Sequence, residues 1–250
     1  GSTYLQTLLT KQYEQLMRKG LYYPSIGEKG HNWQAESGLG AGNGEDIAFG
    51  KIDLYDALFT SCKTKIDFET MLISCEILCE QATRELFWQQ LTNFQSDYPC
   101  QISVVYYMRD PFALLVSNYS HWVKAYGFTG TLSEFIIENR NGGFGLHQIH
   151  YAHEIFDQAR KFPKIEFIPL RYENHTMDLF SHFISEICCI PDVDFDQMED
   201  LDFANKGIGI SELNFLRGVN EIDPEIGKHI GWDLSDLNAR KFVFNCNEQI

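Results

Sequence analysis

Arg109 and Ser117 are the two residues of this sequence whose types and spacing best suit the binding of a phosphate group. Arg109 follows the apolar run 101–108, which predicts a strand, and Ser117 comes eight residues later on the helix predicted over 112–125. A guanidinium fork and a hydroxyl both donate hydrogen bonds to phosphate oxygens. Ligands of open α/β sheets bind beyond the carboxyl ends of the strands, so we expect these side chains to hold a phosphorylated ligand there. A surface salt bridge of Arg109 is the alternative.

The first three residues, Gly1, Ser2 and Thr3, form a second candidate for phosphate binding. They are small, and they lead directly into a helical pattern over 3–19 that Gly20 ends. Backbone amides at a helix N-terminus bind anions. The sequence therefore predicts that an anion lies at the start of this helix.

Predicted strands and helices alternate along the chain. Near-continuous apolar runs, typical of buried parallel strands, occur at 101–110 and inside 69–78. The remaining expected strands are 21–25 and 164–173, and the remaining expected helices are 147–160, 176–187, 211–221 and one that follows a capping box of Thr131 and Glu134. This order predicts an α/β domain with a mostly parallel sheet flanked by helices. The stretch 26–50 holds seven glycines and is expected to be a long loop.

Charge and cysteine content narrow the class of protein. The net charge of −15 over 250 residues argues against nucleic-acid binding, which needs clustered Lys and Arg. No apolar run is long enough to predict a membrane span. The seven cysteines show no CxxC pair, and we expect free, mostly buried thiols in a reducing compartment, hence a cytoplasmic location.

The phosphate-binding motifs resemble those of sulfotransferases that use 3′-phosphoadenosine-5′-phosphosulfate (PAPS). That family carries a strand–loop–helix of the form Lys-x-Gly-Ser/Thr-Thr-x-Leu-Gln, and residues 1–6 (GSTYLQ) match its second half. A later strand of the family ends in Tyr-x-x-Arg-x-Pro, with a Ser eight residues after the Arg. Tyr106, Arg109, Pro111 and Ser117 match that pattern. The similarity runs in order from residue 1 to about residue 220.

Two weaker similarities lie further along the chain. Tyr172 in the stretch LRYENH resembles a family Tyr near the adenine, and Lys206-Gly207 is similar to a late loop at the 3′-phosphate. The resemblance implies that Gly1, Ser2 and Thr3 cradle the 5′-phosphosulfate.

The resemblance also implies a fold, a cosubstrate and an acceptor. Residues 1–250 would form one domain with a P-loop-NTPase-like, three-layer α/β fold. The cosubstrate would be PAPS, the product PAP, and no metal would be needed. The acceptor would be a hydroxyl, with a glycan or glycolipid as the expected type. The family's loop Lys and its first, central strand would precede Gly1, so the domain is expected to be truncated within the 5′-phosphosulfate loop.

Sulfuryl transfer to a hydroxyl needs a general base, and the sequence offers two main candidates. His31, in the glycine-rich loop beyond strand 21–25, is the first choice, with the capping of a loop backbone as its alternative role. Glu76, near the end of the strand inside 69–78, is the second, where a half-buried carboxylate is expected. Glu28 is a third option in the same loop as His31.

Two other functions remain open at the level of sequence. One is a P-loop kinase acting on a small molecule, which would need a Lys-bearing loop and an Asp for Mg²⁺. The other is a non-catalytic module that binds a nucleotide such as PAP.

Overall fold

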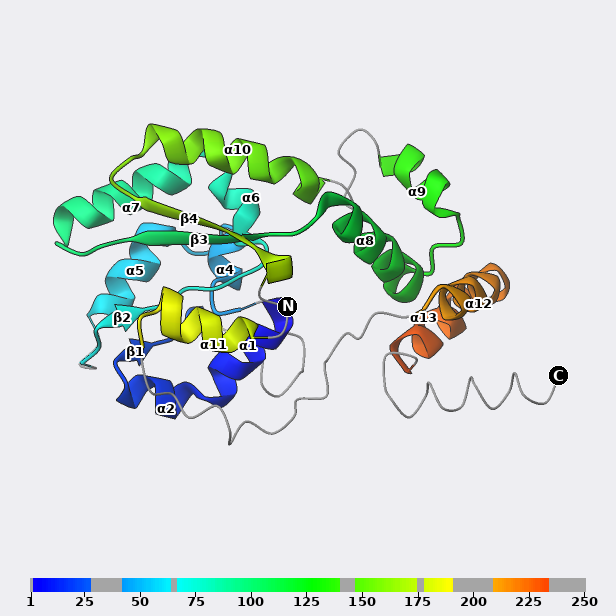
Figure 1. The fold of residues 1–250 in the computed structure, drawn as a ribbon, viewed down its shortest axis with the longest axis horizontal. Helices are drawn as coiled ribbons and strands as arrows, with labels where there is room; N and C mark the ends of the chain where they lie inside the picture. The colour runs from blue at the N-terminus through cyan, green and yellow to red at the C-terminus, as the bar shows by residue number, and fades with distance from the viewer. Residues whose placement is uncertain are drawn as a thin grey trace. The chain divides into compact units, whose positions relative to one another are not determined.

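The chain forms two compact units. The computed structural model describes residues 2–27, 42–63, 67–139, 147–174, 178–190 and 209–233. Unit 1 consists of Gly1–Met108 with Tyr151–Asp200, and unit 2 consists of Arg109–His150 with Leu201–Ile250 (Figure 1). The prediction that residues 1–250 form one sulfotransferase-like domain is not tested by this division and stays a prediction.

Unit 1 contains all the described strands. Its elements, in chain order, are α1 (Ser2–Lys11), α2 (Tyr13–Arg18), β1 (Leu21–Tyr22), α4 (Glu45–Ala48), α5 (Leu54–Cys62), β2 (Thr70–Met71), α6 (Leu78–Ala82), α7 (Glu85–Asp97), β3 (Ser103–Met108), most of α10 (His147–Lys161), β4 (Glu166–Arg171), the 3₁₀ turn η1 (Tyr172–Asn174), α11 (Leu179–His182) and the π-helical turn η2 (Phe183–Ile187). Four helices make up most of the described part of unit 2: α8 (Pro111–Tyr126), α9 (Leu132–Asn139), α12 (Ile210–Ile222) and α13 (Pro224–Asp233).

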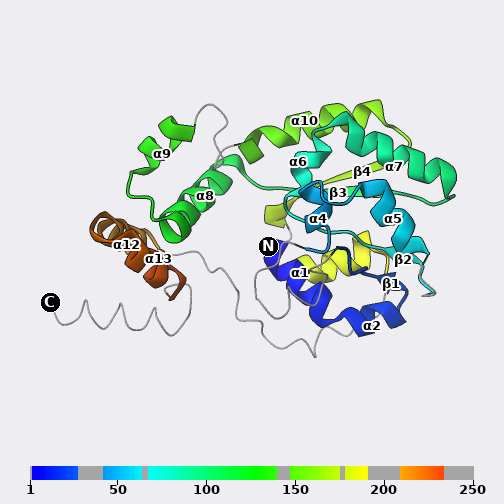
Figure 2. The ribbon, with the colours of Figure 1, turned by 180° about the vertical axis from the view of Figure 1, so that it is seen from behind.

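The strands pair in parallel, as the sequence predicts. β1 lies beside β2, with Leu21 opposite Thr70, and β3 lies beside β4 along six residue pairs from Ser103–Glu166 to Met108–Arg171. These are two separate two-stranded sheets (Figures 1 and 2). The fold is therefore a mostly helical mixture of helices and short parallel sheets, compatible with the expected α/β class.

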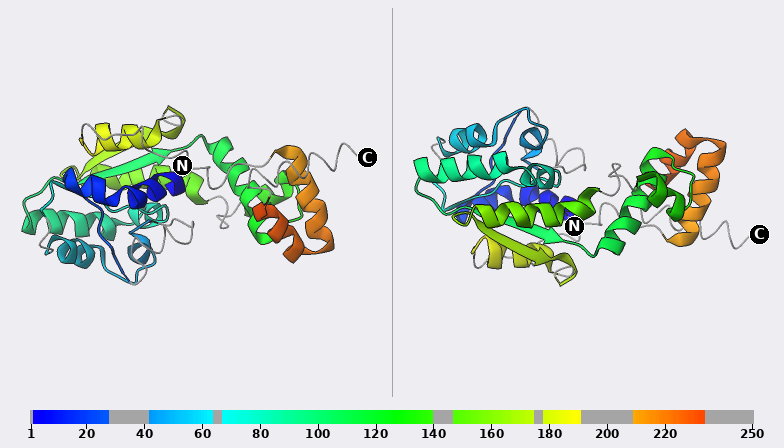
Figure 3. Two further views of the ribbon diagram at one scale, coloured as in Figure 1. Left: turned by 90° about the horizontal axis from the view of Figure 1, so that it is seen from below. Right: turned by 90° about the horizontal axis from the view of Figure 1, so that it is seen from above.

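β3 is covered by side chains on both faces. Val104 and Tyr106 pack against a cluster built by α5, α7 and α10, in which Trp88 is fully buried and donates from Nε1 to the Ala82 carbonyl at 2.8 Å. On the other face, the Tyr107 hydroxyl lies 3.2 Å from Nδ1 of His182 on α11. Figure 3 shows α10 and α11 on opposite sides of β4.

Local sequence signals explain the bounds of α8. Asp110 caps the helix by accepting a hydrogen bond from the Ala113 amide at 2.9 Å, and Pro111 takes the first helical position, where no N–H is needed. Gly127 ends the helix in the left-handed region, with φ of 70°. The prediction of a helix over 112–125 is confirmed.

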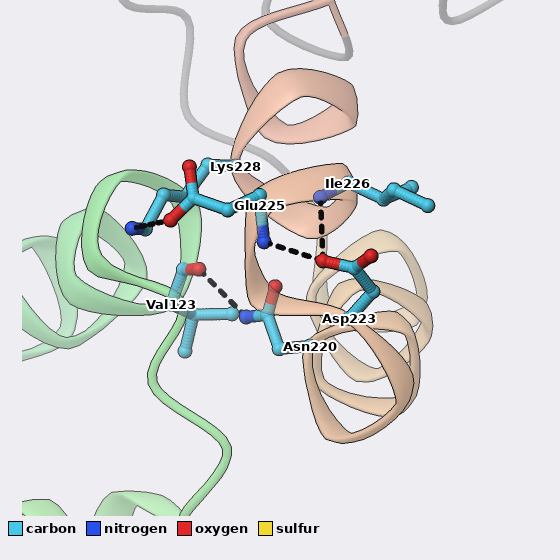
Figure 4. Close-up of polar contacts among 6 residues, drawn as sticks. All are labelled: Val123, Asn220, Asp223, Glu225, Ile226 and Lys228. Atoms are coloured by element: carbon cyan, nitrogen blue, oxygen red, sulfur yellow. Dashed lines mark hydrogen bonds and ion pairs between the residues drawn. The ribbon is translucent and has the colours of Figure 1, made fainter.

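Unit 2 is held together by a small apolar core and one buried amide. Tyr119 and Val123 of α8 pack with Leu216 of α12. Asn220, on α12 and only 1% exposed, donates from Nδ2 to the Val123 carbonyl at 2.9 Å (Figure 4) and to the Phe128 carbonyl at 3.2 Å. It thereby satisfies carbonyls at the end of α8 that have no helical partner.

Two side-chain caps fix further helix starts in unit 2. Asp223 accepts from the amides of Glu225 and Ile226 and so begins α13 (Figure 4). The predicted capping box is confirmed: the Thr131 amide and hydroxyl donate to Glu134 at 2.7 and 2.8 Å, and the Glu134 amide donates to the Thr131 hydroxyl. α9 follows directly.

Several sequence predictions need correction. The helix expected over 3–19 is two helices that separate at Gln12, and the strands expected at 21–25 and inside 69–78 pair over two residues each. The helices α4, α5, α6, α7 and α13 were not expected from the sequence. The six described cysteines are free thiols, but Cys188 alone among them is buried, so the expectation of mostly buried thiols is wrong. None of the described helices is long and apolar enough to cross a membrane.

Candidate functional site

Three predicted site residues follow the carboxyl ends of strands. Glu76 lies in the turn between β2 and α6, Arg109 comes directly after β3, and Tyr172 comes directly after β4. Because Met108 and Arg171 are paired in register, Arg109 and Tyr172 leave neighbouring strands at the same level. This is the edge of a parallel sheet at which ligands bind.

Arg109 and Ser117 are both exposed. Arg109 precedes α8, and Ser117 lies within it. Ser117 lies six residues beyond Pro111, or about 9 Å along the helix axis. The amide at the start of α8 is already occupied by the Asp110 carboxylate. Both residues belong to unit 2, whereas Glu76 and Tyr172 belong to unit 1.

Glu76 is an exposed carboxylate, so the predicted half-burial is wrong. Two thiols lie close to it: Cys75 directly precedes it, and Cys79 is on α6. Burial raises the pKa of Cys75 to about 11 and that of Cys79 to about 12, and in both cases the Glu76 charge raises the pKa further. These thiols are protonated at neutral pH, so they are poor nucleophiles.

Tyr172 is half-buried and opens the turn η1 after β4. Beside it, Nε of Arg171 lies 3.5 Å from the Glu173 carboxylate. An aromatic ring at a strand end is suited to stacking on a planar base.

The start of α1 lies at the carboxyl end of β2. Gln6, on the second turn of α1 and 1% exposed, is 3.4 Å from the Ser74 hydroxyl, which follows β2. Its other side-chain atom, Oε1, is buried without a hydrogen-bond partner in the described structure. A left-handed Gly42 lets the loop pass close to both residues, because a Cβ there would meet the Ser74 carbonyl oxygen at 1.9 Å.

Asn43 is a residue of this edge that the sequence analysis missed. Its Nδ2 donates to the carbonyls of Pro24 and Leu72, and its Oδ1 accepts from the Ser74 amide at 2.7 Å. The side chain thus joins the end of β1 to the end of β2. The signal for a turn was present in Gly42-Asn43-Gly44, but the partners lie 19 to 31 residues away in the chain.

Several predicted residues lie outside what the structure describes. Gly1, Glu28, His31, Lys206 and Gly207 belong to this group. Ser2 and Thr3 are part of α1, which confirms that these residues open a helix.

Comparison of the chain with protein-family models, with curated proteins and with solved structures finds no match.

Proposed function

We propose that the protein is a PAPS-dependent sulfotransferase that transfers a sulfuryl group to a hydroxyl, with a glycan or glycolipid as the acceptor. The observation that carries the proposal is Arg109 at the carboxyl end of β3, followed by Ser117 on α8. The positions of these two residues agree with the resemblance of the sequence motifs to those of PAPS-dependent sulfotransferases. We also propose that the sheet has a P-loop-like arrangement.

In this proposal, Arg109 and Ser117 bind the 3′-phosphate of PAPS. The guanidinium supplies charge-assisted hydrogen bonds and the hydroxyl supplies a further donor. Because the whole chain carries a net charge of −15, the affinity for a multiply charged nucleotide must come from such local donors. Tyr172 would lie against the adenine, and Ser2, Thr3 and Gly1 would face the 5′-phosphosulfate.

The transfer step joins the acceptor oxygen to sulfur. As that bond forms, the bond between sulfur and the bridging phosphate oxygen breaks, PAP leaves with the electron pair, and the hydroxyl proton passes to a base. Glu76, exposed in the turn after β2, is one of the two candidates for this base. His31, which lies outside the described residues, is the first choice for this base, and Glu76 is the second.

Isothermal titration calorimetry of PAP and of adenosine 5′-phosphosulfate tests the assignment. Arg109→Ala should weaken PAP binding by about 1.5–3 kcal/mol, the scale of hydrogen bonds to a charged group. Adenosine 5′-phosphosulfate lacks the 3′-phosphate, so its binding should change much less. Arg160→Ala is the matched control, because Arg160 is an exposed arginine of α10 whose described ion pair is with Asp157.

Ser117→Ala should show the same preference for PAP, with a smaller loss near 1 kcal/mol. Ser133, exposed on α9, gives the control Ser133→Ala. Equal losses for both nucleotides in Arg109→Ala, or no PAP binding by the unaltered protein, would refute the proposal.

A further inference from the structure

Unit 2 carries most of the large apolar side chains that are exposed in the described structure. The most exposed of them is Ile222 at the end of α12, at 88%. The apolar cluster of unit 2 is small, with five buried side chains among the described residues. Apolar side chains that gather on one part of a surface mark a site of interaction with another molecule.

The inner face of α12 is buried within unit 2. Leu213, Leu216 and Asn220 of this helix are buried, and the two leucines pack in the same cluster as side chains of α8. Figure 4 shows Asn220 directed at the Val123 carbonyl of α8. These contacts fix which side of α12 is turned away from the rest of unit 2.

The outer face of α12 is a stripe of four residues. Ser211, Phe215, Gly218 and Ile222 follow one another at intervals of four, three and four residues, the spacing that aligns side chains along a helix. All four are exposed, Phe215 at 50%. Small and large side chains alternate along the stripe, which is about 16.5 Å long at about 1.5 Å per residue.

Gly218 has no role in the packing of the described chain. A Cβ at this position would meet no heavy atom within 4 Å in the described structure. A glycine inside a helix costs about 1 kcal/mol relative to alanine. Its usual benefit is that another group can approach the backbone closely. The outer face of α12 therefore has an open space beside two large apolar side chains.

The stripe is complementary to itself when two copies of α12 lie antiparallel. A two-fold axis midway between Phe215 and Gly218 places Phe215 of one copy opposite Gly218 of the other. The same operation places Ile222 opposite Ser211. Every large side chain of the stripe then meets a small residue. In a parallel pair in register, Phe215 would face Phe215 and Gly218 would face Gly218.

Charge also favours a second copy over other partners. Identical faces bring identical charges together, so a face that pairs with itself must be neutral, and none of the four stripe residues is charged. The net charge of −15 disfavours nucleic acid and the anionic surface of a membrane.

We propose that Ser211, Phe215, Gly218 and Ile222 form a two-fold dimer interface, on which α12 of a second copy of this chain packs antiparallel. Phe215 of each copy fills the open space at Gly218 of the other. The stripe is short compared with a standard interface, so the dimer should dissociate in the micromolar range. The inference rests on the shape of α12, so it stands whether or not the protein binds PAPS.

Sedimentation equilibrium at micromolar concentrations of the protein measures the dissociation constant. Phe215→Ala should weaken the dimer at least about 10-fold, because the ring is lost from both symmetric contacts. Leu86→Ala is the matched control, because Leu86 is 62% exposed but lies on α7 in unit 1, and its dissociation constant should not change. Far-UV circular dichroism should be the same for all these chains.

Gly218→Phe separates a shaped interface from a merely apolar one. The substitution adds apolar area at a position with open space, so it should not disturb the fold of a single chain. In the proposed dimer two phenyl rings would then meet at each contact, and association should weaken at least about 10-fold.

A mixture of the two variants gives the most specific measurement. The Phe215→Ala chain keeps Gly218, and the Gly218→Phe chain keeps Phe215. In the mixed pair, one contact is the original Phe215–Gly218 contact, and the other joins the introduced phenylalanine to the introduced alanine. The mixed dimer should therefore be at least about 10-fold tighter than either variant alone.

Four results would overturn the proposal. The unaltered chain could stay monomeric at every concentration, Gly218→Phe could strengthen association, or the mixture could be no tighter than its components. A monomer that co-sediments with phosphatidylcholine vesicles, and loses this binding in Phe215→Ala, would assign the face to a membrane. A dimer that responds as described to both substitutions and to their mixture would support the interface even if no nucleotide binds.

Discussion

Replacement of Asn220 by alanine tests how unit 2 is held together. The side-chain amide makes two hydrogen bonds to carbonyls of the α8 end, each worth about 1–1.5 kcal/mol when it satisfies a buried group. The small cavity left by the shorter alanine side chain destabilises the fold by about a further 1 kcal/mol. Two effects offset part of this loss of stability. Alanine has a higher helix propensity than asparagine, by about 0.5 kcal/mol, and the substitution removes the buried Oδ1, which has no hydrogen-bond partner in the described structure. We expect Asn220→Ala to lower the free energy of unfolding by about 2 kcal/mol.

Urea denaturation followed by circular dichroism measures this change, with the midpoint shifted and the slope preserved. Asn214→Ala is the matched control, because Asn214 lies on the exposed side of the same helix, and its change should stay within about 0.5 kcal/mol. Equal effects of the two substitutions would refute the role assigned to Asn220.

A double-mutant cycle with Gly227 sharpens the test. A Cβ on Gly227, in α13, would lie 1.7 Å from Asn220 Oδ1, so Gly227→Ala should destabilise the protein. In the Asn220→Ala background that oxygen is gone, and Gly227→Ala should lose most of its cost. Additive effects of the two substitutions would show that α13 does not pack against this amide.

Two further predictions concern the capping box and the catalytic base. Hydrogen bonds from Thr131 lower the pKa of Glu134 below its ordinary value of 4.5, so this carboxylate stabilises the fold above that pH and the stabilisation is lost as the pH falls through the depressed value. Glu134→Gln should therefore lower the melting temperature at pH 7 but not in acid below its folded pKa, and a difference independent of pH would contradict this. For the base, His31→Ala should lower kcat by about 10²–10⁴-fold with PAP affinity retained, and Glu76→Gln should have a smaller effect. The opposite order, in a sulfation assay with a generic hydroxyl acceptor, would assign the role to Glu76.

The sequence predicts those parts of the fold that depend on residues close together in the chain. Strand β3 follows from its apolar run, and the start of α9 follows from the Thr131–Glu134 pair. β1 is shorter than predicted because pairing stops before Pro24, which has no N–H to donate. Helix α5 was missed because a nine-residue apolar segment fits a buried strand as well as a helix.

At the candidate site, the order of residues along the chain predicts which residues follow the ends of strands, but it does not predict which side chains pack around them. Arg109 directly follows β3, as its apolar run predicts, whereas Tyr172, expected within strand 164–173, follows β4, which ends at Arg171. The role of Asn43 depends on Pro24, Leu72 and Ser74, which tertiary packing alone brings to it. The exposure of Glu76 likewise depends on how the turn after β2 packs.

The interleaved order of the two units has a consequence for how the protein folds. β3 ends at Met108 and its partner β4 begins at Glu166, with α8 and α9 between them, while the rest of unit 2 follows residue 200. During synthesis, β3 must wait for β4 until all of unit 2's first segment, Arg109–His150, has left the ribosome. If α8 and α9 collapse early, they shorten the effective loop that β3–β4 pairing must close, and so reduce its entropic cost. Substitutions that weaken the α8–α9 contacts should therefore slow the folding of unit 1, although they lie outside it.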